Sequence, residues 1–407
     1  MTKFVTHRLE DIADLCLGKM LDAQKNKGVE RPYLANVNVR WGEFDLVDLR
    51  MMRFEDRELD RFGLRAGDIV MCEGGEPGRC AIWKDEVPEI TIQKALHRIR
   101  VRVGVDQRFL YYAFLHKGKT GGFQHLFTGS TIKHLPAEKL RLLEVGLPPL
   151  GVQVEVAQRL SALDDLIDNN RRRIKLLEES VRLLFDEWFV RLRFPGASTS
   201  LSPGELPAGW SREPFGRLTS KIGSGATPRG GEGSYVEEGI PLIRSQNVYD
   251  YEFVDEGLAF IDEDQAARLD GVTVAAHDVL LNITGASVGR CCMVPSRLVP
   301  ARVNQHVMII RAAANMDPHY LLCSINSDAR KRQLLSYAQT GSTREALTKD
   351  LMSSFEVLVP DTATLTAFGQ IARDVFDQRE VLSAQNVKLR TARDLLLPRL
   401  MSGELTV

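Results

Sequence analysis

Apolar residues recur every seven positions along two long stretches of the chain. The residues that share this spacing are Val156, Leu163, Leu177 and Leu184 in the first stretch, and Phe368, Val375, Leu382, Leu389 and Leu396 in the second. A heptad pattern sustained over four to five repeats is typical of coiled-coil helices. Prolines stand close to residues 148 and 360, where a helix can begin. The pattern therefore predicts long helices over residues 148–192 and 360–407.

In the second predicted helix, polar side chains interrupt the row of apolar residues, which we call the seam. Arg379, Asn386 and Arg393 occupy positions at which the first helix has apolar residues. A polar residue at a seam position typically fixes the register and the partner of a coiled coil. We interpret these three residues, together with Trp188 on the first helix, as candidates for docking another subunit. In the alternative, the apolar row drifts around the helix, so that these three side chains lie at its edge with their polar groups in water.

Shorter β-rich runs with Gly and Pro turns precede each helix. Examples are "GDIVMC" at 67–72, "HRIRVRV" at 97–103, "DVLLNI" at 278–283 and "HVMIIR" at 306–311. These runs predict two mixed α/β regions, over residues 1–147 and 211–359. Residues 193–210 are rich in Pro, Gly and Ser and are predicted to be a linker with little packed structure.

The two halves repeat one another. "FTGSTIKHL" at 127–135 returns as "QTGSTREAL" at 339–347, 212 residues later. Upstream, "AGDIVMCEGGEPGRCAIW" at 66–83 matches "AHDVLLNITGASVGRCCMV" at 276–294. A repeat of this length indicates a duplicated module of a globular domain and a helix, not a short solenoid unit.

Composition narrows the class of protein. The chain has 407 residues, enough for two or three domains, and a formal charge of −1, so any basic surface must be local. No apolar segment reaches transmembrane length and the N-terminus lacks a signal-peptide pattern. The six cysteines show no paired metal-binding spacing, which favours buried thiols in the reducing cytoplasm.

Motifs for catalysis, metal binding or nucleotide binding are absent from the sequence. "AFLHKGKT" at 113–120 approaches a P-loop, but alanine stands at its first glycine position. The chain is therefore predicted to be no enzyme by itself, with no catalytic residue, metal ligand or cofactor of its own.

Groups suited to nucleic acid gather near the two Thr-Gly-Ser-Thr segments. Basic residues that can neutralise phosphates are Lys117, Lys119, Arg330, Lys331 and Arg332. The hydroxyls of Thr128, Ser130, Thr131, Thr340, Ser342 and Thr343 either present groups to phosphate or simply belong to turns that end a strand. Base contacts are expected where the halves differ, because Arg, Asn and Gln read base edges. The candidates are Asn36, Asn38, Arg40, Gln93 and Lys133 in the first half, and Arg244, Gln246, Asn247, Asn304, Gln305 and Arg344 in the second.

These features together resemble one family, the specificity subunits of Type I restriction–modification systems. The resemblance rests on "IPLIRSQNV", the paired "TGST" segments, the long helices, "LFDEWFVRLRFPG" closing the first module and "LLLPRLMSGEL" closing the second. It covers essentially the whole chain. The first module departs from the pattern in "LANVNVRWGE", a looser version of the recognition-domain entry.

The resemblance implies an α+β fold with two α/β target-recognition domains, two long antiparallel coiled-coil helices and an internal two-fold pseudo-repeat. Each recognition domain would read half of a split, asymmetric DNA site. The helices would act as a spacer and dock two copies of an adenine methyltransferase subunit, joined by a translocating nuclease for restriction. S-adenosylmethionine, ATP and Mg would be needed only in those partners.

Helix length gives a separate argument for a spacer. A helix of about 40 residues is about 60 Å long, and DNA repeats every 34–36 Å or so.

Two other classes of function remain open at this point. One is a free-standing DNA-binding protein without a methyltransferase partner, and the other is a coiled-coil scaffold with two protein-binding heads.

Overall fold

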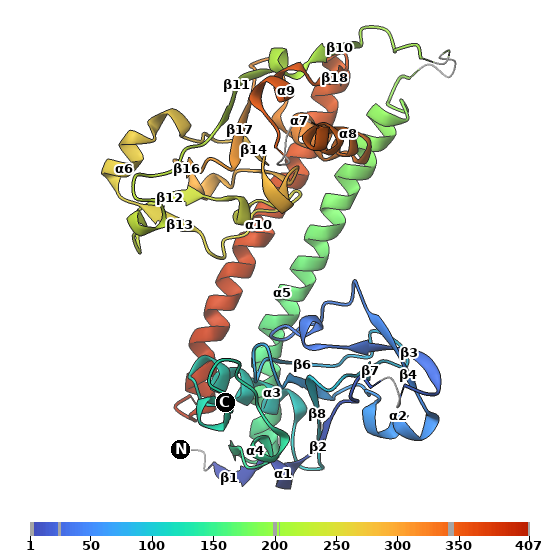
Figure 1. Ribbon diagram of the computed structural model, residues 1–407, viewed down its shortest axis with the longest axis vertical. Helices are drawn as coiled ribbons and strands as arrows, with labels where there is room; N and C mark the ends of the chain where they lie inside the picture. Colours follow the sequence, from blue (N-terminus) through green and yellow to red (C-terminus); the bar gives the residue numbers. More distant parts are fainter. Residues whose placement is uncertain (1–3, 23–25, 198–201, 203, 341–345, 406–407) are drawn as a thin grey trace. The chain divides into compact units, whose positions relative to one another are not determined.

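Two long helices carry the heptad pattern in the computed structural model (Figure 1). Helix α5 spans Leu150–Phe185 and continues as a π-helical turn at Asp186–Val190. Helix α10 spans Thr362–Met401, so both helices begin close to the predicted positions. The structure describes residues 4–22, 26–197, 202, 204–340 and 346–405.

Contacts divide the chain into two units. Unit 1 holds residues 1–169 and 385–407, and unit 2 holds residues 170–384. Each unit thus combines a globular region with part of both long helices. The helices belong to the units because their seam residues are buried in the two cores, for example Leu160 in unit 1 and Phe368 in unit 2.

The described residues of unit 1 form three small sheets. The largest is antiparallel with the strand order β2-β8-β5-β6, the second has the order β4-β3-β7, and β1 pairs with β9. The strands are β1 (Val5–Arg8), β2 (Ala13–Leu17), β3 (Val29–Leu34), β4 (Arg50–Phe54), β5 (Ile69–Cys72), β6 (Cys80–Ile82), β7 (Thr91–Ile92), β8 (Leu96–Val101) and β9 (Glu144–Leu147). The shorter helices are α1 (Leu9–Ile12), α2 (Asp56–Phe62), α3 (Gln107–Lys119) and α4 (Ala137–Arg141).

Unit 2 repeats this topology strand for strand. Its sheets have the orders β11-β17-β14-β15 and β13-β12-β16, and β10 pairs with β18. The strands are β10 (Ser211–Pro214), β11 (Thr219–Ser224), β12 (Ile240–Ile243), β13 (Ala259–Ile261), β14 (Val279–Asn282), β15 (Cys291–Met293), β16 (Arg302–Val303), β17 (Val307–Ala312) and β18 (Glu356–Val359). The shorter helices are α6 (Glu263–Arg268), α7 (Pro318–Asn326), α8 (Asp328–Thr340) and α9 (Lys349–Ser354). The repeat in the sequence is therefore a repeat of the fold.

A buried ion pair marks the same place in both four-stranded sheets. Asp68 accepts two hydrogen bonds of 2.7 Å from Arg100, and Asp278 accepts two of 2.7 Å from Arg311. The arginine lies on β8 or β17, and the aspartate stands just before β5 or β14. A fork of two charge-assisted bonds fixes the geometry of both partners, so each pair pins the same two strands together.

In unit 1 a polar network ties α3 to the long helices. Asp164 on α5 accepts a hydrogen bond of 2.7 Å from the Tyr112 hydroxyl and one of 2.6 Å from the Arg393 guanidinium. Burial raises the pKa of Tyr112, and Asp164 adds to the shift by its charge and as the hydrogen-bond acceptor. The hydroxyl therefore stays protonated and remains a donor. At the other end of α3, Lys119 forms an ion pair with Asp394 of α10.

In unit 2 aromatic rings join α5 and α10 to the globular region. Phe189 contacts Phe368 with ring centroids 5.0 Å apart and Tyr320 of α7 at 4.9 Å. Trp210, at the end of the predicted linker, is also buried here and donates a hydrogen bond of 3.1 Å to Asp361. The described residues of 193–210 form no helix or strand, but the segment is packed at this end, because the large indole is buried.

The residues proposed for partner docking face the inside of the chain. Arg379 pairs with Glu178 at 2.5 Å in unit 2, and Arg393 pairs with Asp164 in unit 1. Asn386 is 4% exposed and Trp188 is 7% exposed. The docking prediction is therefore wrong for these four residues, and the alternative of polar heads in water is wrong for the three polar ones. An arginine on one helix reaches a carboxylate on the other, which satisfies the charge within the seam.

Two further expectations concern buried cysteine thiols and the lack of a membrane-spanning segment. All six cysteines are free thiols, of which Cys16 is half-buried and the other five are buried. Among the residues that the structure describes, no helix combines the length and the apolar character needed to cross a bilayer.

Candidate nucleic-acid interface

One end of the four-stranded sheet in unit 1 gathers most of the predicted contact residues. Strands β2 and β5 both run antiparallel to β8, so they end where β8 begins. The loops after Leu17 and Cys72 and the turn before Leu96 therefore meet at this end. The segment from Thr128 to His134 joins them, because the N–H of Leu135 donates to the carbonyl of Glu73 at 2.8 Å.

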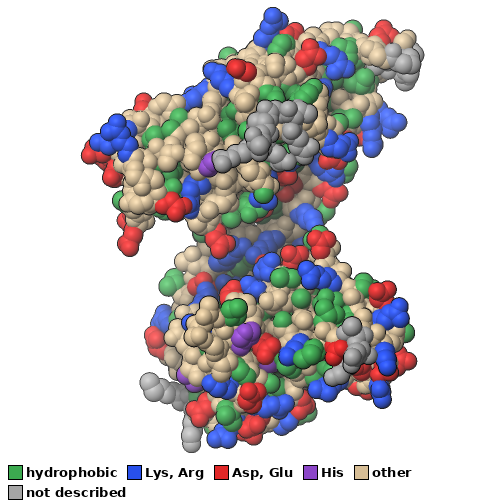
Figure 2. Space-filling model, in the orientation of Figure 1, with side chains coloured by type: hydrophobic (Ala, Val, Ile, Leu, Met, Phe, Trp, Pro, Cys, Tyr) green, Lys and Arg blue, Asp and Glu red, His purple; other side chains and the backbone are tan. Residues whose placement is uncertain are grey.

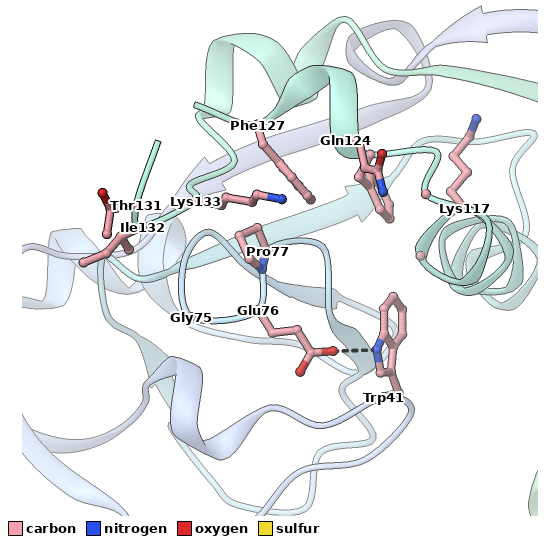
Figure 3. A pocket seen from close by; sticks show the side chains of 13 residues that line it. Trp41, Gly75, Glu76, Pro77, Lys117, Gln124, Phe127, Thr131, Ile132 and Lys133 are labelled. Carbon is pink, nitrogen blue, oxygen red and sulfur yellow. Dashed lines mark hydrogen bonds between the residues drawn. The ribbon is translucent and has the colours of Figure 1, made fainter. Parts of the chain in front are cut away.

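A cleft of about 550 Å³ lies at this end of unit 1 (Figure 3). Three predicted residues, Lys117, Thr131 and Lys133, line it. Residues that the sequence analysis did not single out also line it: Trp41, Gly75, Glu76, Pro77, Gly118, Gly121, Phe123, Gln124, Phe127 and Ile132. Figure 3 shows the Trp41 indole on one side of the cleft and the Phe127 ring and Lys133 side chain on the other. The cleft thus combines aromatic faces with ammonium groups.

Trp41 is held in place by two features. Its indole N–H donates to the Glu76 carboxylate at 3.1 Å. Its ring lies against Gly118 of α3, where a Cβ atom would approach the indole to 2.5 Å. Glycine at position 118 is therefore needed for the ring to pack on the helix. A tryptophan beside glycine in the loop "VRWGE" was the sequence signal for this residue.

Lys117 and Lys133 differ in their surroundings. Burial lowers the pKa of Lys117, although the Glu144 carboxylate opposes that effect. Lys133 is exposed. A partly buried ammonium interacts more strongly with a phosphate than one in open water. Both lysines can serve an anionic ligand at the cleft, and their contact with DNA stays a prediction.

The first Thr-Gly-Ser-Thr segment closes a loop. The N–H and carbonyl groups of Thr128 and His134 exchange two hydrogen bonds of 2.9 Å. Gly129 has a φ of 90°, and a Cβ there would lie 2.2 Å from the Ile132 carbonyl oxygen, so glycine is required. Ser130 and Thr131 are exposed at the tip. The segment therefore forms a turn, and the exposed hydroxyls of Ser130 and Thr131 can still face a phosphate.

Two of the predicted base readers hold a turn. The Asn38 carboxamide accepts from the N–H of Ala35 at 2.9 Å and donates to the carbonyl of Asp45 at 3.0 Å. Asn247 does the same in unit 2, with Arg244 and Val254 as partners at 3.0 and 2.9 Å. Both side chains are buried, at 7% and 0% exposure. These two residues are therefore scaffold, and the prediction that they read bases is withdrawn.

Gln93 and Asn304 form a second equivalent pair. The Gln93 side chain accepts from the N–H of Ala95 at 3.2 Å, and the Asn304 side chain accepts from the N–H of His306 at 3.2 Å. Each side chain caps the turn that leads into β8 or β17. A residue with the same task in both units is not suited to distinguish two half-sites, so this pair too is reassigned to the scaffold.

The other predicted residues of unit 1, Asn36, Arg40 and Lys119, each make a different contact. Asn36 donates to the carbonyl of Gly74 at 3.4 Å, at the end of the sheet already described. Arg40 is exposed and donates to the carbonyl of Val37 at 2.6 Å. The ion pair with Asp394 already neutralises Lys119, which removes it from the set of available phosphate contacts.

The predicted residues of unit 2 fall into two groups. Arg244 and Gln246 both donate to the carbonyl of Gly257, at 2.6 and 3.0 Å, while Gln305 is exposed at the end of the four-stranded sheet. On α8, the Arg330 guanidinium lies 5.8 Å from the Phe355 ring centre, Lys331 pairs with Asp250, and Arg332 is exposed. The side chain of Thr340 and the whole of Ser342, Thr343 and Arg344 lie outside the described residues.

Charge on the visible surface is mixed. Figure 2 shows Lys and Arg side chains interspersed with Asp and Glu on the face in view of each unit. This agrees with the formal charge of −1 and with the expectation that any basic surface is local.

Comparisons with known proteins show what the chain is similar to. Residues 1–179 match the family model for the Type I restriction modification DNA specificity domain. The MjaIX specificity subunit of Methanocaldococcus jannaschii is 24% identical over 347 residues, which cover 84% of this chain and 78% of that protein. The chain is thus similar, over most of its length, to the specificity subunits of Type I restriction–modification systems. A second relative, the HindI specificity subunit of Haemophilus influenzae, is 20% identical and matches 68% of this chain and 72% of its own length.

A solved structure shares the fold of this chain. The S subunit of a Type I system from M. genitalium superposes with a TM-score of 0.60 at 16% identity, covering 98% of this chain and 96% of the other. At this level of identity the likeness concerns the mixed α/β fold alone.

Proposed function

We propose that the chain is the DNA sequence-recognition subunit of a Type I restriction–modification enzyme and has no catalytic activity of its own. One observation carries the proposal. The two units have the same strand order and the same buried ion pair, but differ in the side chains at the corresponding ends of their four-stranded sheets. One scaffold with two sets of loops suits the reading of two different sequences.

The proposed target is a bipartite, asymmetric DNA site. Each unit would read one half, and the unread spacer between the halves would depend on α5 and α10, which both pass from one unit into the other. In unit 1 the lysines at the Trp41 cleft would neutralise phosphates while aromatic groups pack on the sugar or base. Arg40 and Arg244 are retained as candidate base contacts.

The proposed partners are double-stranded DNA, two copies of an adenine methyltransferase subunit and, for restriction, a translocating nuclease. S-adenosylmethionine, ATP and Mg would be bound by those partners, and the assembly would act on DNA in the cytoplasm. The residues first chosen for docking are occupied within the chain. In their place, the proposal uses exposed apolar side chains on α5 and the turn that follows it: Leu176, Leu183 and Val190, which are 65%, 49% and 51% exposed.

The spacing of these three side chains supports docking. Leu176 and Leu183 are seven residues apart on α5, so they lie on one face, which differs from the seam buried against α10, and Val190 follows at the same spacing in the π-helical turn. An exposed apolar stripe of this kind is suited to a helical partner surface.

Co-expression with a candidate adenine methyltransferase subunit tests the function. Long-read sequencing of host DNA would map methylated adenines with and without this chain. We expect a split, asymmetric motif that depends on the chain. A stable complex without new methylation would contradict a role in targeting methylation, and DNA binding without any complex would favour the free-standing DNA-binding protein.

A further inference from the structure

A chain of four hydrogen-bonded side chains lies at one end of the large sheet in unit 2. The Thr227 hydroxyl donates to Oε1 of Gln305 at 2.6 Å, and Nε2 of Gln305 lies 3.0 Å from Nε2 of His306. On the other side of the imidazole, Nδ1 of His306 lies 2.7 Å from Oγ1 of Thr284. Thr227 and Gln305 are exposed, while Thr284 and His306 are half-buried.

The four residues come from three separate loops. Strands β11 and β14 both run antiparallel to β17, so the loops after Ser224 and Asn282 meet the turn before Val307. This is the same end of the sheet at which unit 1 has its cleft. The residues are therefore brought together by the tertiary structure and not by the sequence.

Unit 1 has no such chain at the corresponding positions. Gly18 and Gly225 lie equivalently, each with its missing Cβ against the carbonyl oxygen of Gln93 or Asn304, so Met20 corresponds to Thr227. The positions that correspond to Thr284, Gln305 and His306 are occupied by Gly74, Lys94 and Ala95. The strand pairing at both sheets fixes this correspondence. The polar chain is thus a difference between the units within a shared scaffold.

The hydrogen bonds orient the Gln305 carboxamide. Oε1 accepts from the Thr227 hydroxyl and Nε2 faces the His306 imidazole, so both ends of the amide are held. Nδ1 of His306 is then the protonated nitrogen and donates to Thr284. One N–H of Nε2 and one lone pair of Oε1 are left over on an exposed side chain. A donor beside an acceptor at this spacing matches N7 and the 6-amino group of adenine in the major groove.

We infer that Gln305 reads an adenine in the half-site bound by unit 2, and that Thr227, His306 and Thr284 are positioning residues that hold its amide. The inference rests on the proposed function and adds the residue and the base to it. An amide fixed in advance loses less rotational freedom on binding than a free glutamine side chain, which strengthens discrimination.

The experiment compares variants in the assembled methyltransferase complex. The motif is first mapped with the wild-type chain, and competition binding then uses duplexes that carry each of the four base pairs at every position of the second half-site. For Gln305→Ala we expect discrimination at one adenine position to fall by roughly 5- to 150-fold, with the first half-site unchanged. Gln305→Glu should shift the preference at that position toward cytosine, whose 4-amino group a carboxylate accepts.

For a positioning residue such as His306, the measurement must separate a change in base preference at one position from a general loss of stability. His306→Ala should relax the same position and no other, while His306→Asn, which retains an acceptor, should restore part of the preference. Gln378→Ala, an exposed glutamine on α10 of the same unit, is the matched control and should leave every position unchanged.

Two results would overturn the inference. One is a Gln305→Ala variant with the wild-type base preference at every position, and the other is an equal loss of affinity for all four base pairs. A wild-type chain that directs no split motif would instead overturn the proposed function, and this inference with it.

Discussion

At the scale of single residues, the same side-chain type serves both scaffold and recognition. Asn38, Asn247 and Asn304 were chosen because amides read bases, yet each caps a turn in which its oxygen accepts a backbone N–H. Gln305, which stands beside Asn304, remains exposed. Gln93, a glutamine, caps a turn as the asparagines do, so burial and local hydrogen bonding, not residue type, decide which amide can meet DNA.

Lys133 allows a prediction about DNA affinity. The Lys133→Gln variant should bind DNA more weakly for all sequences alike, and the slope of log K against log salt should be shallower by about 0.9, because one phosphate contact is lost. Binding isotherms at several salt concentrations measure this. The matched control is Lys119→Gln, whose ammonium is already paired with Asp394, and it should leave the slope nearly unchanged. An equal effect of the two variants would contradict the assignment.

Asp394 allows a prediction about pH. Burial acts to raise the pKa of this carboxyl, but the hydrogen bond from Lys119 and the charge of Arg393 outweigh it, so the pKa is lowered. A lowered pKa means that the ionised form stabilises the fold above the unfolded-state pKa of about 3.9, and that this contribution is lost as the pH falls through the folded-state value.

The Asp394→Asn variant should therefore be less stable than the wild type at pH 6 by about 0.5–1 kcal/mol, a modest value because the pair is partly exposed. The difference between the two proteins should shrink below about pH 4. Urea unfolding of both chains across this range measures it, and a difference that grows with acidity would refute the argument.

At the scale of elements, the heptad pattern gave the positions of α5 and α10, but not what their polar seam residues contact. Arg379 and Arg393 each meet a carboxylate on α5. Burial raises the pKa of Glu178, and the Arg379 charge opposes the shift. The sequence places an arginine on the seam, whereas its partner depends on the register between two helices that are far apart in the chain.

The apolar stripe on α5 leads to a prediction about assembly. Leu176→Ser and Leu183→Ser should each weaken binding of the methyltransferase subunit by about 10- to 100-fold, since burial of a leucine side chain is worth about 1.5–3 kcal/mol. Calorimetric titration of the two subunits measures this. Val236→Ser removes an exposed apolar side chain of unit 2 away from the long helices and should have little effect. Unchanged binding by both leucine variants would place the docking surface elsewhere.

At the scale of the whole molecule, the duplication decides the architecture. Both units use the same strand orders, and a long helix follows the globular region of each half of the sequence. The short runs "GDIVMC" and "DVLLNI" predicted strands correctly, as β5 and β14. Which strands pair, and in which order, depends on contacts across many residues that local patterns do not specify.

The spacer hypothesis is tested by lengthening both long helices together. Seven residues inserted after Asn169 in α5 and after Ala384 in α10 add about 10.5 Å of helix and keep the heptad phase. At 3.4 Å or so per base pair, the unread spacer of the methylated motif should grow by about three base pairs, or activity should be lost. Long-read methylation mapping gives the spacer. Seven residues inserted into the 193–210 segment are the control, and an unchanged spacer after the helix insertions would contradict the hypothesis.

The sequence by itself determined the features that repeat along the chain: two helices with a period of seven, two β-rich regions and two Thr-Gly-Ser-Thr segments. Such features are local, because they follow from the geometry of neighbouring residues. Only the tertiary structure decided the rest. It brought Trp41 to Lys133 and Thr227 to His306, turned the seam arginines toward carboxylates inside the chain, and buried Trp210 in what resembled a linker. These outcomes depend on which distant segments meet, and burial and hydrogen bonding at those meetings set the role of each side chain.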